Sequence, residues 1–171
     1  MKNRSQKDEC SFVSLRDMER VLKITSWFYS KKSLLFEPMR KRKLKNADDS
    51  YQSQLSELNR AFILALMTCY HSCLYNGETR FNYRRIIGDS FAFDNYCFSD
   101  QDDWVLYETL KCQHVFLDNI KLNDNIARNS ALLENVFMMI VCIELRIPLF
   151  IGNTIYLLHT CDLFFFKASF C

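Results

Sequence analysis

Cysteine and histidine are the residue types in this chain best suited to chemistry, and their spacing matches no common site. The 171 residues include eight Cys and three His, without a C-x-x-C pair. Cys69, His71 and Cys73 form the densest group. On a helix Cys69 and Cys73 share a face while His71 points away, which disfavours a zinc site. We expect buried, reduced thiols there and no bound metal.

No pattern in the sequence predicts a catalytic residue. A catalytic thiol needs a neighbour that stabilises its thiolate, such as a helix N-terminus, and nothing local marks one. His114 lies within an expected helix without metal-ligand spacing around it. The acidic run Asp100, Asp102 and Asp103 lacks the glycine and the closing glutamate of an EF-hand, so capping of the next helix is the better interpretation.

A phosphate-binding loop begins but does not continue near the end of the sequence. The apolar residues 147–151 predict a short buried strand, and Gly152 follows it. A P-loop requires G-x-x-x-x-G-K-[ST], whose backbone N–H groups, lysine and hydroxyl hold the phosphates and magnesium. In that register the chain has Leu157, Leu158 and His159. We therefore expect no ATP hydrolysis by this chain, because the groups that reaction requires are missing.

Composition predicts a mainly helical protein. Apolar residues make up 49% and charged residues 25%, an ordinary globular balance for one domain with a sizeable core. Only three Gly and two Pro occur, which leaves few residues for tight turns. The net charge of +2 is uneven, because residues 1–60 hold 14 Lys/Arg against 8 Asp/Glu, while residues 61–171 hold 8 against 12. Two differently charged parts are therefore expected.

Apolar periodicity places the helices that must position these residues. Ser14 is expected to cap a helix that runs to Tyr29, with Asp17 in a capping-box position. A second, broadly apolar helix begins after Tyr51 and is expected to stop at Gly77. A short helix that begins near Arg80 and ends near Gly88 is expected next, followed by helices at 102–120 and 130–145.

The basic stretch at 31–50 is expected to be an exposed linker. Its charge is dense, Pro38 blocks helix continuation and apolar periodicity is lost. The run Arg40–Lys45 has two interpretations, a nucleic-acid patch or a solvated connector. No aromatic residues are interleaved for base stacking, so the connector is favoured and no specific nucleic acid is expected as a partner.

The apolar stretch at 147–166 has the length of a membrane span but not its composition. It contains Asn153, His159 and Asp162, and a charge at mid-span costs about 2.5–3.5 kcal/mol. Membrane anchoring through this tail is therefore disfavoured and kept as an alternative. The N-terminus has no apolar run behind its charges and is no secretory signal, so we expect a cytoplasmic location.

Two longer stretches resemble a known family. Residues 10–29, CSFVSLRDMERVLKITSWFY, and residues 131–150, ALLENVFMMIVCIELRIPLF, look like mysterin, the giant AAA+ and RING-finger type of E3 ubiquitin ligase. The resemblance covers residues 10–151 and is most specific at its two ends. It implies a parent protein that couples ATP hydrolysis to ubiquitin transfer and that binds ATP with magnesium, and zinc. No cofactor is expected in this chain itself.

The resemblance also implies a division of the chain. It places the end of an AAA+ lid-like helical region at 1–30, the basic linker at 31–50, a helical region leading into the next AAA+ module at 51–146, the strand before an absent P-loop at 147–151, and a divergent apolar tail at 152–171. We expect this tail to come from a truncated gene model, a retained intron or alternative splicing.

Arg16 is the one residue that the resemblance assigns to a site. In an AAA+ lid it would take a sensor-2-like place, reaching towards nucleotide bound by the preceding module. The other interpretation is a surface arginine that pairs with Glu19 and is repelled by Arg20, which is favoured when no partner domain is present. We expect a non-catalytic fragment that associates with AAA+ modules of the same family. An independent helical interaction protein is the alternative.

Overall fold

The structure is a computed structural model that describes residues 14–44, 50–91, 103–121 and 126–148. In these ranges the chain forms helices and short turns of 3-10 helix, without a strand. The prediction of a mainly helical fold is confirmed. The elements are, in order, α1 (Leu15–Ser30), α2 (Lys32–Lys41), η1 (Ser50–Ser53), α3 (Glu57–Cys69), η2 (His71–Cys73), α4 (Gly77–Ser90), α5 (Trp104–Asp118) and α6 (Ser130–Leu145).

Most helices begin at a polar residue whose side chain caps free backbone N–H groups. The Ser14 hydroxyl accepts from the Asp17 N–H at 3.2 Å, and the Asp17 carboxylate accepts from the Ser14 N–H, so the predicted capping box is present. Such a cap stabilises a helix by about 1 kcal/mol. The other capping residues are Ser56, Asn76, Asp103 and Asn129.

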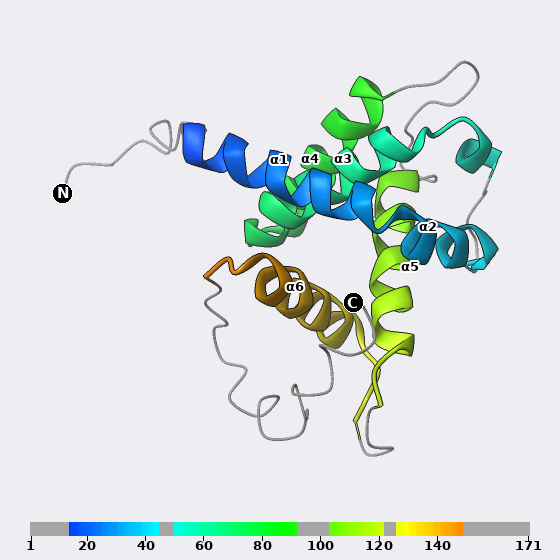
Figure 1. Ribbon diagram of the computed structural model, residues 1–171. Coiled ribbons are helices and arrows are strands. Elements are labelled where there is room, and N and C mark those ends of the chain that lie inside the picture. Colours follow the sequence, from blue (N-terminus) through cyan, green and yellow to red (C-terminus); the bar gives the residue numbers. More distant parts are fainter. Residues whose placement is uncertain (1–13, 45–49, 92–102, 122–125, 149–171) are drawn as a thin grey trace.

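The main core lies where α1, α2, α3, α5 and α6 meet. Figure 1 shows α1 running across α3 and α2 lying against α5, with α6 below α1. At its centre the Phe137 ring lies 6.1 Å from the Phe28 ring and 5.6 Å from the Phe116 ring, and all three side chains are buried. A smaller cluster joins η1, α3, α4 and α5 through Tyr51, Leu55, Ile63, Met67, Ile87, Trp104 and Val105. Buried aromatic rings therefore help to hold α1, α5 and α6 together at the centre of the main core.

The expected exposed linker is wrong at 32–41, where the chain forms α2. Pro38 lies inside this helix and removes one backbone hydrogen bond, a change that costs about 3 kcal/mol in a helix interior. The helix forms because Leu35, Phe36 and Met39 are fully buried in the main core, and each such side chain contributes about 1.5–3 kcal/mol. Residues 45–49 of the expected linker lie outside the described residues.

The predicted stop at Gly77 is also wrong. The long apolar helix ends at Cys69, one turn of 3-10 helix follows, and Gly77 is the first residue of α4. The reason is Asn76, whose side-chain oxygen accepts from the Glu78 N–H at 2.8 Å and caps a new helix. The predicted helices at 14–29, 102–120 and 130–145 are confirmed by α1, α5 and α6.

The expected strand at 147–151 is not present in its described part. After α6, Arg146 adopts the left-handed conformation, and the Ile147 N–H donates to the Cys142 carbonyl at 2.8 Å. Ile147 and Pro148 have no regular structure, and residues 149–151 and the tail 152–171 lie outside the described residues. Among the described helices, none has the length and apolar character needed to cross a membrane.

Candidate functional site

Arg16, the candidate sensor-2 residue, is exposed on the first turn of α1. Its neighbour Asp17 pairs with Arg20 at 3.7 Å. The hydrogen bonds from Ser14 are the main cause that lowers the pKa of the Asp17 carboxyl, so Asp17 carries its charge at neutral pH. An ionised carboxylate, paired with Arg20, therefore lies next to Arg16 on the first turn of α1.

In the densest Cys and His group of the sequence, His71 faces an arginine. His71 is on η2, and its Nε2 lies 2.8 Å from the Arg84 Nη1. Arginine only donates, so this Nε2 must accept and its lone pair is occupied. The described ranges contain no cluster of three or more Cys, His, Asp or Glu that could hold a metal ion.

His71, Arg84 and Asp103 form a chain of polar contacts between three elements. Arg84 of α4 donates from Nε to the Asp103 Oδ2 at 2.6 Å, and the Asp103 Oδ1 caps α5 by accepting from the Leu106 N–H at 3.0 Å. Burial, followed by the charges of Arg84 and Arg80, lowers the pKa of His71 to about 4. His71 is therefore neutral near pH 7, and its Nε2 accepts a hydrogen bond from the Arg84 guanidinium.

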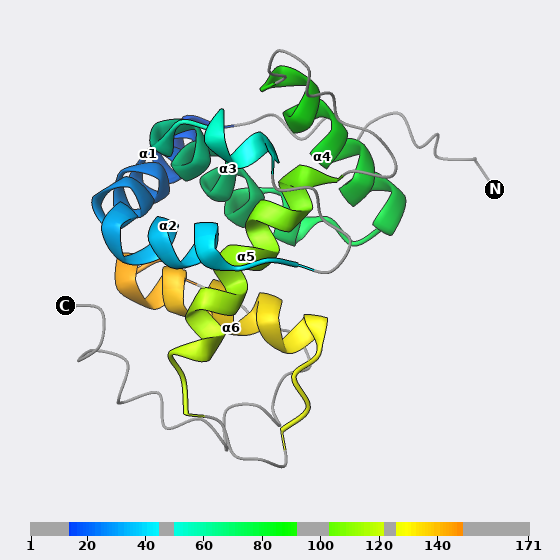
Figure 2. The ribbon, with the colours of Figure 1, turned by 90° about the vertical axis from the view of Figure 1, so that its right-hand side faces the viewer.

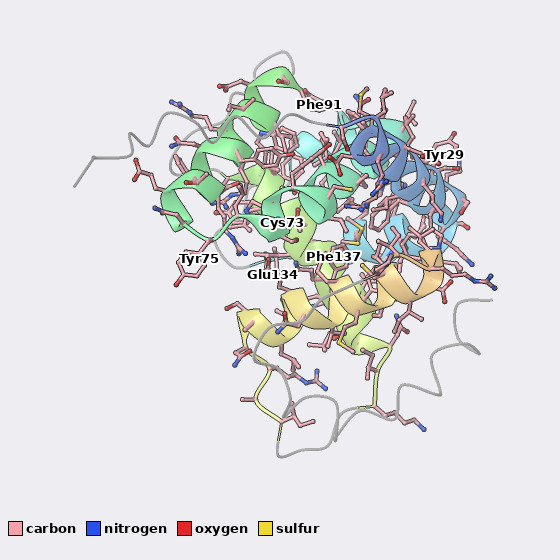
Figure 3. The ribbon with its side chains drawn as sticks, turned by 90° about the vertical axis from the view of Figure 1, so that its left-hand side faces the viewer. Tyr29, Cys73, Tyr75, Phe91, Glu134 and Phe137 are labelled. Atoms are coloured by element: carbon pink, nitrogen blue, oxygen red, sulfur yellow. The ribbon has the colours of Figure 1, made fainter. Side chains whose placement is uncertain are left out.

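Arg80, one turn before Arg84, joins three elements in a similar way. It donates from Nε to the Leu74 carbonyl at 2.7 Å and from Nη2 to the Ser72 carbonyl at 3.4 Å. It also pairs with Glu134 of α6, with both N–O distances at 3.1 Å. Figure 3 shows Glu134 on α6 facing the turn that carries Cys73. We call Arg80 and Arg84 with their partners the arginine clamps.

A third polar group is fully buried between α3 and α5. The Arg60 Nε lies 2.5 Å from the Glu108 Oε1, and neither side chain is exposed by more than 1%. The Arg60 guanidinium also lies 5.4 Å from the Phe36 ring centre, and Lys111 lies 5.5 Å from the Tyr51 ring centre. Because both side chains are fully buried, the Arg60–Glu108 ion pair can fix α3 relative to α5 but cannot contact a substrate.

Three cations of the basic run after Pro38 lie close to carboxylates. Arg40 pairs with Glu57 at 3.6 Å, Lys41 pairs with Glu37 at 3.4 Å, and Arg42 pairs with Asp118. Arg40 shares Glu57 with Lys32, whose Nζ lies 2.7 Å from the Glu57 Oε2, and exposed pairs of this kind contribute little. That no specific nucleic acid is a partner therefore stays a prediction. His114 lies nearby, half-buried, and burial followed by the charge of Arg42 lowers its pKa.

Sequence reasoning missed both arginine clamps and the buried pair. The side chains that pair are 13 to 54 residues apart in sequence, so no local spacing connects them. The available signal was Arg60 itself, which interrupts the apolar face of α3 within NRAFILAL. A charge at a core position requires a buried partner of opposite charge, and Glu108 on α5 would have been the candidate.

Comparison with known proteins finds similarity to RNF213-type ubiquitin ligases. A family model described as RNF213 AAA domain matches residues 125–153, which include α6 and its capping residue Asn129. Human E3 ubiquitin-protein ligase RNF213 is 38% identical over 148 residues, which cover 86% of this chain and 3% of the relative. The resemblance to mysterin, another name for RNF213, is confirmed.

Two further relatives agree with this assignment. The mouse E3 ubiquitin-protein ligase RNF213 is 36% identical over 148 residues, and the zebrafish E3 ubiquitin-protein ligase rnf213-beta is 38% identical over 151 residues. The chain spans about 3% of the length of these curated relatives. No solved structure matches it. The similarity therefore concerns one segment of RNF213-type ligases, in the AAA region.

Proposed function

We propose that this chain is a non-catalytic structural segment of the AAA+ ring of an RNF213-type ubiquitin ligase. It would join a lid-like helix at its start to the next AAA+ module through α6. The observation that carries the proposal is the match of the RNF213 AAA domain to residues 125–153. Within this range the described residues form α6, which Asn129 caps and which is followed by the apolar Ile147 and Pro148.

The chemistry of the described residues supports a structural role. Burial raises the pKa of the Cys69 thiol to about 12 and raises the pKa of Cys112 well above its ordinary value, so neither thiol is an activated nucleophile. His71 is held by Arg84, and Glu108 by Arg60. In the parent ligase, ATP with magnesium and zinc would be bound by parts of the protein outside this segment.

A chimera tests this proposal directly. In human RNF213, the 148-residue matching segment is replaced by the corresponding residues of this chain, and ATP hydrolysis and ubiquitin transfer are measured on the purified protein. A flexible linker of equal length in the same place is the control. We expect the chimera to retain both activities and the linker variant to lose them. A folded chimera as inactive as the linker variant would overturn the proposal.

The surface of α1 supports AAA+ modules of the same family as partners. Leu15, Met18 and Leu22 lie on one stripe of the helix and are 86%, 53% and 64% exposed. Exposed apolar side chains grouped in this way are typical of a surface that packs on another domain. The same stripe is compatible with the alternative of an independent helical interaction module. The four free cysteines of the described residues fit the proposed cytoplasmic location.

The sensor-2-like role of Arg16 is a separate part of the proposal. In the chimera, R16A should lower ATP hydrolysis by about tenfold or more if the guanidinium reaches nucleotide phosphates, because a charge-assisted contact contributes about 1.5–3 kcal/mol. The matched control is R85A, an exposed arginine on α4. Equal ATP hydrolysis by the two variants would assign Arg16 to the helix surface.

A further inference from the structure

Lys23 of α1 binds the last carbonyl of α6. Its Nζ donates to the Leu145 oxygen at 2.8 Å, and Leu145 is the final residue of that helix. The backbone on both sides of Lys23 is held in place, because Val21 and Ile24 are buried in the main core together with Leu145. The first helix of the structure therefore holds the point at which the chain leaves the last one.

The end of α6 suits a cation supplied from another helix. The last carbonyls of an α-helix have no partner within it and carry a partial negative charge. The last turn of α6 contains no basic residue. The Lys23 ammonium group supplies this charge from α1, at the distance of a charge-assisted hydrogen bond.

The backbone turns directly after this contact. Arg146 is left-handed, its N–H donates to the Ile143 carbonyl at 3.2 Å, and the Ile147 N–H donates to the Cys142 carbonyl at 2.8 Å. These two bonds have the pattern of a Schellman turn. The Leu145 carbonyl and the Arg146 N–H belong to one planar peptide group, so Lys23 holds one side of the group whose other side forms the turn.

The contact also joins two parts of the chain with different similarity. The RNF213 AAA domain model matches residues 125–153, which include all of α6, whereas α1 lies outside that range. Leu22, the neighbour of Lys23, belongs to the exposed apolar stripe of α1. Lys23 therefore lies between the surface proposed to receive a partner module and the helix that belongs to the AAA domain.

We propose that Lys23 is a positioning residue that couples α1 to the AAA domain of the parent ligase. By holding the Leu145–Arg146 peptide group, it sets the direction in which the chain leaves α6. A shift of α1, caused by a module that packs on its stripe, would thereby reach the residues that follow α6. This inference rests on the proposed function, in which α6 leads into the next AAA+ module.

The first experiment measures amide hydrogen exchange of the full chain by NMR, residue by residue. K23M keeps the length of the side chain and removes the ammonium group, whereas K23R keeps the charge. We expect the Arg146 and Ile147 amides to exchange about threefold to tenfold faster in K23M, the effect of one lost hydrogen bond, and at the natural rate in K23R. The matched control is K41M, which changes an exposed lysine that pairs with Glu37 within α2.

Two exchange results would overturn the proposal. If the Arg146 and Ile147 amides exchange at the natural rate in K23M, Lys23 does not hold the turn. If K23M accelerates exchange equally throughout α1 and α6, Lys23 supports the whole fold and has no particular effect on the end of α6.

The second experiment places the same variants in the RNF213 chimera and measures ATP hydrolysis. We expect K23M to lower the turnover rate by about threefold or more, K23R to restore it and K41M to leave it unchanged. An active chimera in which K23M and K41M hydrolyse ATP equally would overturn the coupling and leave the proposed function standing. A folded chimera without activity would overturn the proposed function, and the coupling with it.

Discussion

The main core and the α4 region are held by different kinds of contact. In the core, α1, α5 and α6 meet through stacked and edge-on aromatic rings such as Phe28 and Phe137. Helix α4, which Figure 2 shows at the outer edge of the molecule, buries only Ile87 and Gly88. Besides the smaller apolar cluster, its attachment uses the arginine clamps, which are directional and depend on the protonation of their partners.

This difference predicts two modes of failure. Apolar burial is non-directional and scales with area, so damage to the main core should lower the stability of the whole domain. A lost hydrogen bond at a peripheral helix should release that helix first, because local opening needs less free energy than global unfolding. The Arg60–Glu108 pair joins α3 to α5, which belong to both regions. Its loss therefore tests whether the two regions unfold together.

The largest effect is expected from F137A in the main core. The Phe137 side chain is 1% exposed and touches two other rings, so its removal leaves a cavity and should lower the free energy of unfolding by about 3–5 kcal/mol. Urea unfolding followed by circular dichroism measures it. The control is Y75A, a fully exposed residue, with an expected change within about 0.5 kcal/mol. Similar values for both variants would contradict the role of the aromatic core.

The second effect concerns the buried pair. E108Q removes a charge but keeps the shape, which leaves the Arg60 guanidinium buried without its counter-charge and should cost about 3 kcal/mol. The double variant R60M/E108M should recover most of this loss, because no buried charge is left. Urea unfolding of the natural chain, E108Q and R60M/E108M measures the three free energies of unfolding. If E108Q matches the natural chain, Arg60 is not held as the structure shows.

The third effect separates the two regions. R84A removes the contacts to His71 and Asp103 and should cost about 1.5–3 kcal/mol for a charged hydrogen-bonding group. Hydrogen exchange should accelerate in α4 while α1 and α6 keep their protection. R85A, an exposed arginine on the same helix, is the matched control. Equal acceleration in all helices would show that α4 belongs to the main cooperative unit.

The fourth effect makes the α4 region sensitive to pH. His71 has a pKa of about 4 in the folded chain and about 6.5 when unfolded, so the unfolded chain binds more protons between these values. Stability should therefore fall as the pH is lowered from 6.5 towards 4. H71N removes this contribution, so its urea midpoint should depend less on pH over that range. An unchanged pH profile in H71N would assign the loss to carboxylates instead.

Local chemistry explains which parts of the fold were predictable. The cap at Ser14 and the periodicity of α1, α5 and α6 act within a few residues, and the sequence predicted these helices. Helix α2 was missed because its formation depends on burial against distant helices, which outweighs the local effect of Pro38. Tertiary packing routinely overrides such propensities.

The polar contacts were missed for a related reason. Each clamp joins residues from separate helices, and the partner of Arg84 is also the cap of another helix. Asp103 was predicted only as that cap. The capping role of Asp103 depends on neighbouring residues and could be predicted from the sequence. Its contact with Arg84 depends on how α4 packs against α5 and could not.

The smallest effect tests whether the main core also depends on a backbone detail. Arg146 ends α6 with a φ of 54°, a left-handed conformation that costs about 1–2 kcal/mol for a residue with a side chain. Glycine adopts it freely but loses about 0.5–1 kcal/mol of additional chain entropy on folding. R146G should therefore stabilise the domain by about 0.5 kcal/mol, seen as a higher urea midpoint. R146A keeps the strain and loses the same exposed side chain, so it should leave the midpoint unchanged. If both variants shift it equally, the gain comes from removing the charge, and the end of α6 carries no backbone strain.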